Sequence, residues 1–387
     1  MKTVQQQPKF EVPYNGDMSI LTIYKQYHEH ITCVYGKAND NYPEGRNTKH
    51  LRSITLSDIK DVINSLNVSN IPFNYILNGN NHSNKEYDKT YRKTFIEFVR
   101  QLKGFGCNQI TLSNVFLIEL IRNEMPEMDI HVSVISEIDN LTRIKHLAKL
   151  GVKNIVLSKT LLKNFNGLAN IHKYKPENVE LILLANDPCL HHCAYTQYHN
   201  QSLSFFTAQG GDFVNFCRLH CTNDFASDIR KVISASFIRP EDIATYKGIG
   251  FLVFKLTDRK QSTSWLENTI KAYVDGRYDG NLSDIMSPWS SYNEQYPFPE
   301  TLKTLKSNAD LVNNRINLRF SPQINNTLLN GYLDYWKQNK PNGCANENCD
   351  NCNYCLQIAQ KTCTVDQVWL DTIMNNTKMA TKFALHV

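Results

Sequence analysis

Short apolar runs alternate with longer amphipathic segments along most of this chain. The short runs have the composition of buried strands, and the longer segments carry apolar residues at helical spacing. We expect strands at residues 10–13, 31–35, 73–77, 109–112, 129–134, 153–157, 179–184 and 250–256. We expect helices at residues 18–30, 55–66, 86–102, 115–123, 141–150, 160–172, 264–274 and one that begins near 239.

This alternation predicts an α/β fold, a TIM-like (β/α)8 barrel. A doubly wound open sheet alternates in the same way, but its dinucleotide-binding version has a Gly-rich loop after the first strand, which this sequence lacks. We therefore expect a barrel domain at residues 8–286 and a C-terminal, Cys-rich extension at residues 287–387. The active site of such a barrel lies at the C-terminal ends of its strands.

Composition and charge set only broad limits on function. The 387 residues, 41% of them hydrophobic, are enough for a barrel-sized core and an appendage. The net charge of +5 permits a polyanionic partner without implying one. The N-terminal residues contain no apolar signal core, and no run approaches the 18 apolar residues of a membrane span. We expect a cytoplasmic protein with no membrane span.

The cysteines carry the clearest chemical signal. Eleven are present, and in a reducing compartment we expect thiols rather than disulfides. Cys189 and Cys193 follow the seventh expected strand directly, and Cys217 and Cys221 repeat their spacing. Thiolates bind iron-sulfur clusters, zinc or copper(I), so the residues leave the metal open. Buried cysteines without a metal are the remaining alternative.

A second group of cysteines lies near the C-terminus. The spacing of Cys349, Cys352 and Cys355 resembles the first three positions of a bacterial ferredoxin run, without the usual fourth cysteine three residues later. Either Cys344 or Cys363 would then be the fourth ligand. A zinc knuckle is the alternative, because structural zinc takes four cysteines at similar spacings. The group consists of Cys344, Cys349, Cys352, Cys355 and Cys363.

Several segments together resemble the collagenase-like peptidase family (peptidase family U-32). The resemblance extends from about Phe10 to Cys355. Its most specific part is the motif Asn186-x2-Cys189-x3-Cys193, followed by His199. The supporting segments are 12–17, 34–36 with 45–46, 150–158, 238–242, 254–256 with Arg259, and 278–282.

The resemblance implies a barrel that holds a 4Fe-4S cluster. Members of the family are associated with oxygen-independent hydroxylation in ubiquinone synthesis and RNA modification, and some work as pairs of related subunits. The cluster motif falls on Cys189 and Cys193, and later cysteines complete it. If both Cys217 and Cys221 are ligands, protein coordinates the whole cluster; if only one is, an iron is open to substrate.

Three further residues are candidates for chemistry at this site. His199 is a candidate proton donor or orienting group, with a structural histidine as the alternative. Arg46 and Lys255 are candidates to hold an anionic substrate or oxygen donor through charge-assisted hydrogen bonds. Solvated or ion-paired barrel residues are the alternative for both. Proteolysis is disfavoured, because the sequence contains neither a GxSxG elbow nor an HExxH motif.

The sequence and the resemblance together favour an iron-sulfur enzyme. We expect oxygen-independent hydroxylation, or a related modification, of a small molecule, a peptide or an RNA base. An electron donor and a related partner subunit would accompany it. The alternative is a non-catalytic electron-transfer or partner subunit of a heteromeric modification complex. One 4Fe-4S cluster is expected in the barrel, and the C-terminal cysteines hold a second cluster or zinc.

Overall fold

The computed structural model describes residues 7–45, 52–209, 216–287, 289 and 322–385. Eight parallel strands form a closed barrel in sequence order, and the first strand pairs with the last. The fold predicted from the alternation is therefore confirmed. The strands are β1 (Lys9–Pro13), β2 (Ile31–Gly36), β3 (Phe73–Leu77), β4 (Gln109–Leu112), β5 (Asp129–Val132), β6 (Asn154–Val156), β7 (Glu180–Leu184) and β8 (Val253–Lys255).

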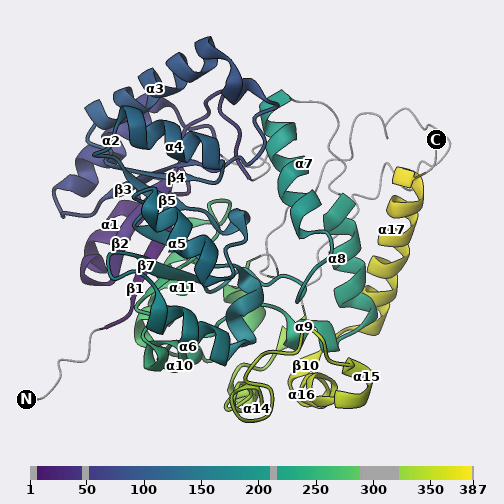
Figure 1. The fold of residues 1–387 in the computed structure, drawn as a ribbon. Helices are drawn as coiled ribbons and strands as arrows, with labels where there is room; N and C mark the ends of the chain where they lie inside the picture. Colours follow the sequence, from purple (N-terminus) through teal and green to yellow (C-terminus); the bar gives the residue numbers. More distant parts are fainter. Residues whose placement is uncertain (1–6, 46–51, 210–215, 288, 290–321, 386–387) are drawn as a thin grey trace, which may run out of the picture.

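Helices cover the outside of the barrel (Figure 1). The strands are buried on both faces, which explains why they are largely apolar runs rather than alternating ones. The covering helices are α1 (Ile20–Gln26), α2 (Leu56–Asn67), α3 (Lys89–Gly104), α4 (Val115–Glu124), α5 (Leu141–Lys149), α6 (Phe165–Tyr174), α10 (Ile243–Ile249) and α11 (Thr263–Asp275).

Local capping determines where several of these helices begin. Thr55 and Asp58 form a reciprocal capping box that starts α2. Two other helices start later than expected, because Asp88 caps α3 and Asn164 caps α6. The residues just before these two caps form short 3-10 helices instead, at Lys85–Tyr87 and Lys159–Lys163.

The connection from β7 to β8 is much longer than the others and departs from the simple repeat. It contains α7 (Thr196–Gln209), α8 (Phe216–Ser227) and α9 (Arg230–Ser234) before α10. Figure 1 shows α7 and α8 standing beside the barrel. The sequence did not predict α7 and α8, although it placed cysteines in this region.

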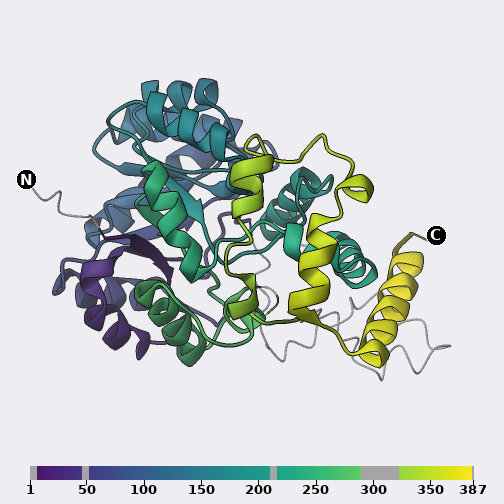
Figure 2. The same ribbon diagram turned by 90° about the horizontal axis from the view of Figure 1, so that it is seen from below.

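The described part of the extension packs on the barrel and on this long connection. It comprises a small antiparallel pair and four helices: β9 (Gln323–Ile324), α14 (Asp334–Asn339), α15 (Cys349–Cys352), α16 (Tyr354–Thr362), β10 (Cys363–Thr364) and α17 (Gln367–Leu385). In Figure 2 its yellow-green helices lie between the barrel and α17, and α17 packs against α8.

Arg239 anchors the extension from within the barrel domain. Its guanidinium binds both carboxylate oxygens of Asp242, at 2.7 and 2.9 Å, and donates to the carbonyl oxygen of Asn326 at 3.0 Å. The ring of Tyr332 lies 5.1 Å from the guanidinium carbon.

None of the described helices combines the length and the apolar character that crossing a bilayer requires.

Candidate functional site

A cavity of about 300 Å³ opens at the C-terminal ends of the barrel strands. Its walls come from loops that follow several strands, including Asn78 after β3, Ser133 after β5 and Asp187 after β7. In a closed parallel barrel these ends meet on one face, where such folds place their active sites. The loop after β7 and the inner sides of α7 and α8 add the outer wall.

Four cysteines line this cavity. Cys189 and Cys193 lie in the loop after β7, and Cys217 and Cys221 lie one turn apart on α8. Residues four apart on a helix face the same side, which explains why both α8 thiols reach the same wall. The two sequence motifs, although far apart along the chain, therefore meet at the barrel mouth.

Burial and a nearby cation act in opposite directions on the first of these thiols. Burial raises the pKa of Cys189 to about 11, and the neighbouring Lys159 opposes this rise. Lys159 Nζ lies 2.7 Å from Cys189 Sγ and 2.9 Å from Asp187 Oδ2. Burial also raises the pKa of Cys217 to about 11. A thiolate at these positions needs positive charge beside it, which a bound metal supplies while releasing protons.

The donor set fits an iron-sulfur cluster. Among the residues that the structure describes, no three Cys, His, Asp or Glu side chains converge as ligands of a single ion would. The thiolates of a 4Fe-4S cluster stand farther apart, since the whole cluster lies between them. Four soft sulfur donors line this cavity, and Lys159 lies beside one of them to offset their charge.

The other predicted site residues have different surroundings. His199, on α7, lines the cavity together with the cysteines. Lys255, at the end of β8, also lines it, and its Nζ lies 3.8 Å from the centre of the Tyr35 ring. Arg46 lies outside the described residues.

A buried carboxylate beneath the cavity pairs with Lys255. Glu11, on β1, forms an ion pair with Lys255 and accepts a hydrogen bond at 3.0 Å from His131 Nδ1. Burial alone would raise the pKa of Glu11, but Lys255 and His131 together lower it to about 2. Lys255 is therefore a cation at the C-terminal end of β8 whose charge Glu11 compensates. Glu11 was not predicted from the sequence, where its only signal is a charged residue within the first apolar strand.

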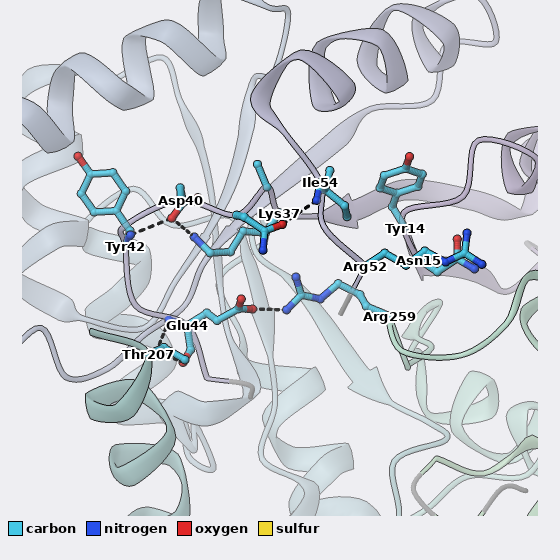
Figure 3. A pocket seen from close by; sticks show the side chains of 12 residues that line it. Tyr14, Asn15, Lys37, Asp40, Tyr42, Glu44, Arg52, Ile54, Thr207 and Arg259 are labelled. Atoms are coloured by element: carbon cyan, nitrogen blue, oxygen red, sulfur yellow. Dashed lines mark hydrogen bonds and ion pairs between the residues drawn. The ribbon is translucent and has the colours of Figure 1, made fainter. Parts of the chain in front are cut away.

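A second basic residue at the barrel mouth is also paired. Arg259 forms a buried ion pair with Glu44, and the two side chains point toward each other in Figure 3. The backbone N–H of Glu44 in turn donates to Thr207 Oγ1 at 3.0 Å, which ties this loop to α7. These residues border a small cavity of about 90 Å³.

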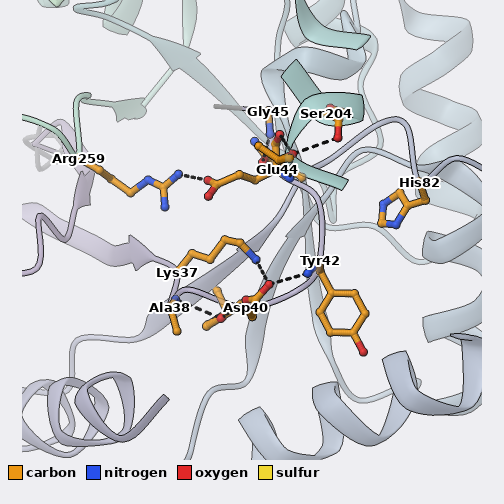
Figure 4. Close-up of polar contacts among 12 residues, drawn as sticks. Lys37, Ala38, Asp40, Tyr42, Glu44, Gly45, His82, Ser204 and Arg259 are labelled. Carbon is orange, nitrogen blue, oxygen red and sulfur yellow. Dashed lines mark hydrogen bonds and ion pairs between the residues drawn. The ribbon is translucent and has the colours of Figure 1, made fainter. Parts of the chain in front are cut away.

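The same loop after β2 contains another ion pair. Lys37 binds Asp40, which also accepts a hydrogen bond from the Tyr42 backbone N–H at 2.8 Å (Figure 4). The same view shows Ser204 of α7 close to Glu44; its hydroxyl accepts from the Asn80 N–H at 3.2 Å. The loops after β2 and β3 are thus held against α7 by polar contacts. These contacts fix the shape of the cavity's outer wall.

The C-terminal cysteines divide into two sets. Cys344, Cys349, Cys352 and Cys355 line another cavity, of about 400 Å³, where the extension meets the loop after β7. Cys363 lies on β10, outside that cavity, and its Sγ is 3.6 Å from Thr362 Oγ1.

Comparison with known proteins identifies the family. The sequence model described as peptidase family U32 matches residues 52–275, more than half of the chain. The chain belongs to peptidase family U32.

The family resemblance seen in the sequence is thereby confirmed. One relative, the "Uncharacterized protease MJ1657" of Methanocaldococcus jannaschii, is 26% identical over 268 residues, which are 68% of this chain and 69% of that protein. The "tRNA hydroxylation protein P" of Haemophilus influenzae is 24% identical over 207 residues, 50% of this chain and 43% of that protein. The chain thus spans less than half the length of this second relative.

Two further comparisons are more limited. The "tRNA hydroxylation protein P" of Escherichia coli is 33% identical over 69 residues, 18% of this chain and 15% of that protein. The solved structure titled "The Structure of the U32 Peptidase Mk0906" superimposes with a TM-score of 0.49 at 11% identity, covering 67% of this chain and 96% of that one. The match with the E. coli protein covers only a small segment, and the assignment of the fold rests on the barrel topology itself.

Proposed function

We propose that this chain is an iron-sulfur enzyme that modifies RNA without molecular oxygen, by hydroxylation or a related reaction. The observation that carries the proposal is the meeting of four cysteines at the barrel mouth, Cys189 and Cys193 from the loop after β7 with Cys217 and Cys221 from α8. The kinship with proteins named for tRNA hydroxylation supports an RNA substrate. The net charge of +5 is compatible with a polyanion.

A 4Fe-4S cluster held by these thiolates would supply single-electron transfer or, at an open iron, Lewis acidity. Lys159 would hold Cys189 in its thiolate form through the contact between Nζ and Sγ. Lys255 would present positive charge to an anionic group of the substrate or the oxygen donor, while Glu11 keeps it in place. His199, on the cavity wall, would donate or accept a proton.

Hydroxylation replaces a C–H bond with a C–O bond and removes two electrons from the substrate carbon. Without molecular oxygen, the oxygen atom must come from water or from an organic hydroxyl donor. With water, two electrons and two protons must pass to an acceptor. With an organic donor, the donor itself leaves in reduced form. The cavity of about 300 Å³ has room for a single base or a small acid beside the cysteines.

The decisive experiment compares RNA from anaerobic cells that express the intact chain or the Cys189→Ser/Cys193→Ser variant. We expect a nucleoside that has gained one oxygen atom with the intact chain and its loss with the variant, as measured by nucleoside mass spectrometry. The Cys33→Ser variant is the matched control, because Cys33 is a buried thiol on β2 that lies outside the cavity lining. Identical nucleoside profiles for all three proteins would contradict an RNA-modifying role.

A second function has an observation in its favour. All four thiols line the same cavity, and if all four coordinate the cluster no iron is left open to substrate. The chain would then act as an electron-transfer or partner subunit of a modification complex. Copurification of a related subunit, together with activity only in the mixture, would favour this role; turnover by the chain alone would exclude it.

A further inference from the structure

The cavity of about 400 Å³ beside the extension is separate from the barrel mouth but shares a wall with it. Leu190, Cys193 and Tyr195, from the loop after β7, line both cavities. The other walls of this second cavity come from α9, α14, α15 and α16. Two groups of cysteines therefore lie on either side of one short loop.

A reversal of the backbone in the extension places three of its cysteines along one cavity. Cys349 and Cys352 begin and end the single turn of α15, whose start is capped by Asn348. Asn353 then adopts φ of 53°, in the left-handed region that Asn tolerates, and α16 starts at the next residue. This reversal places Cys355 on the same cavity wall as the two α15 thiols.

The fourth thiol comes from the preceding turn. Gly343, at φ of 78°, precedes Cys344, and the Cys344 carbonyl accepts a hydrogen bond from the Glu347 N–H at 3.2 Å. All four thiols line the same cavity.

Two basic side chains lie at the walls of this cavity. Lys163 is buried beneath the site, where its Nζ donates to the Ser234 carbonyl at 2.9 Å and lies 5.0 Å from the Trp336 ring. Arg230, on α9, binds Asp350 of α15 at 2.8 Å and so fixes α15 against the cavity. Positive charge at such positions offsets the negative charge of a thiolate-bound cluster.

Polar groups also reach individual sulfurs. The Tyr335 hydroxyl lies 3.0 Å from Cys352 Sγ, and its ring stacks on Tyr354 with centroids 3.9 Å apart. His191 Nε2 lies 3.7 Å from Cys344 Sγ. Hydrogen bonds to sulfur and aromatic shielding are the means by which proteins tune iron-sulfur centres.

We infer that Cys344, Cys349, Cys352 and Cys355 bind a second 4Fe-4S cluster, and that Cys363 is not a ligand. The two-residue spacings from Cys349 to Cys355 follow the ferredoxin pattern, and Cys344 supplies the fourth thiolate. This second site has its own ligands and does not depend on the function proposed for the barrel mouth.

The test measures iron, acid-labile sulfide and zinc in the full-length chain purified without oxygen. The variants are Cys344→Ser and its matched control Cys363→Ser, together with the barrel-mouth variant Cys189→Ser/Cys193→Ser. We expect about eight irons in the intact chain and in Cys363→Ser, and about four in each of the other two. The four irons retained by Cys344→Ser at the barrel mouth would show that the variant is folded. If that variant fails to fold, Cys352→Ser answers the same question.

Three results would overturn the inference. They are zinc in place of iron at the C-terminal cysteines, unchanged iron in Cys344→Ser, and loss of half the iron in Cys363→Ser. An intact chain with about four irons would also be informative. If the barrel-mouth variant keeps them and Cys344→Ser loses them, the second cluster stands and the function proposed for the barrel mouth fails. The reverse result leaves the barrel-mouth cluster and excludes this one.

Discussion

Glu11 is the carboxylate on which the charges inside the barrel depend. It is 1% exposed and contacts Lys255 on one side and His131 on the other. Removing one partner of a buried ion pair leaves the other charge without compensation, which costs far more than losing a surface pair. The residue is therefore important for stability as well as for the position of Lys255 at the cavity.

We predict that Glu11→Gln lowers the free energy of unfolding by roughly 3–5 kcal/mol at neutral pH, measured by denaturant titration. The exposed pair of Arg143 and Asp139 gives the control, since Asp139→Asn should change stability by less than about 1 kcal/mol. Equal losses of unfolding free energy in the two variants would show that the Glu11 ion pair stabilises the protein no more than an exposed pair.

The pH dependence of stability provides a further check on Glu11. Its pKa in the folded protein, about 2, lies below the ordinary 4.5, so the unfolded state binds more protons between these values. Its contribution is complete above about pH 4.5 and is lost as the pH falls toward about 2. The Glu11→Gln protein should show a shallower loss of stability across this acid range.

At the scale of elements, Arg239 joins the barrel to the extension. Its side chain is 1% exposed, and its hydrogen bonds reach Asp242 beside α10 and Asn326 just after β9. A guanidinium can make these contacts together because its donors lie in one rigid plane. The position of the extension, and with it the second group of cysteines, depends on this contact.

We predict that Arg239→Met destabilises the protein by about 3 kcal/mol or more, because Asp242 is left buried without its cation. Limited proteolysis should cut the extension faster in this variant than in the intact chain. The Arg143→Met variant serves as control, as its ion pair is about half exposed. Unchanged cleavage of the Arg239→Met protein would mean that other contacts suffice to hold the extension.

At the scale of the whole molecule, a barrel-mouth cluster would bind two parts of the fold to each other. Cys189 and Cys193 belong to the loop after β7, whereas Cys217 and Cys221 belong to α8, which is backed by α17. Metal binding to the folded state alone adds its binding free energy to stability. The long connection between β7 and β8 should therefore be the part most affected by loss of the cluster.

We predict that removing iron with a chelator lowers the melting temperature of the intact chain by about 5 °C or more. The Cys189→Ser/Cys193→Ser protein should start from a lower melting temperature and respond less to the chelator. Hydrogen exchange should show α8 opening more readily after treatment. The same melting temperature before and after iron removal would contradict a structural contribution of the metal.

Local patterns in the sequence determined the barrel and the place of Cys189 and Cys193. Apolar runs of strand length, separated by amphipathic segments, leave few folds other than a closed parallel barrel. The cysteines at 189 and 193 follow a strand directly, so the barrel fold itself places them at the C-terminal ends of the strands. The domain boundary at 286, the ligand roles and the roles of His199, Arg46 and Lys255 stay predictions.

Other features depended on packing that leaves little trace in the sequence. The helices α7 and α8 bury Ser204 and Thr222 among their apolar residues, so hydrophobic spacing does not mark them clearly. Glu11 and Lys255 are 244 residues apart and meet only because β1 and β8 close the barrel. Spacing alone left both Cys344 and Cys363 as candidates for the fourth ligand.

The tertiary structure separated those two cysteines because the turn at Asn353 brings the thiols of α15 and α16 together and leaves Cys363 on β10. The sequence by itself therefore determined which elements form and which residue types follow them, since both depend on near neighbours along the chain. The tertiary structure alone decided which distant side chains line one cavity or form an ion pair, because these contacts arise only when the barrel closes and the extension packs against it.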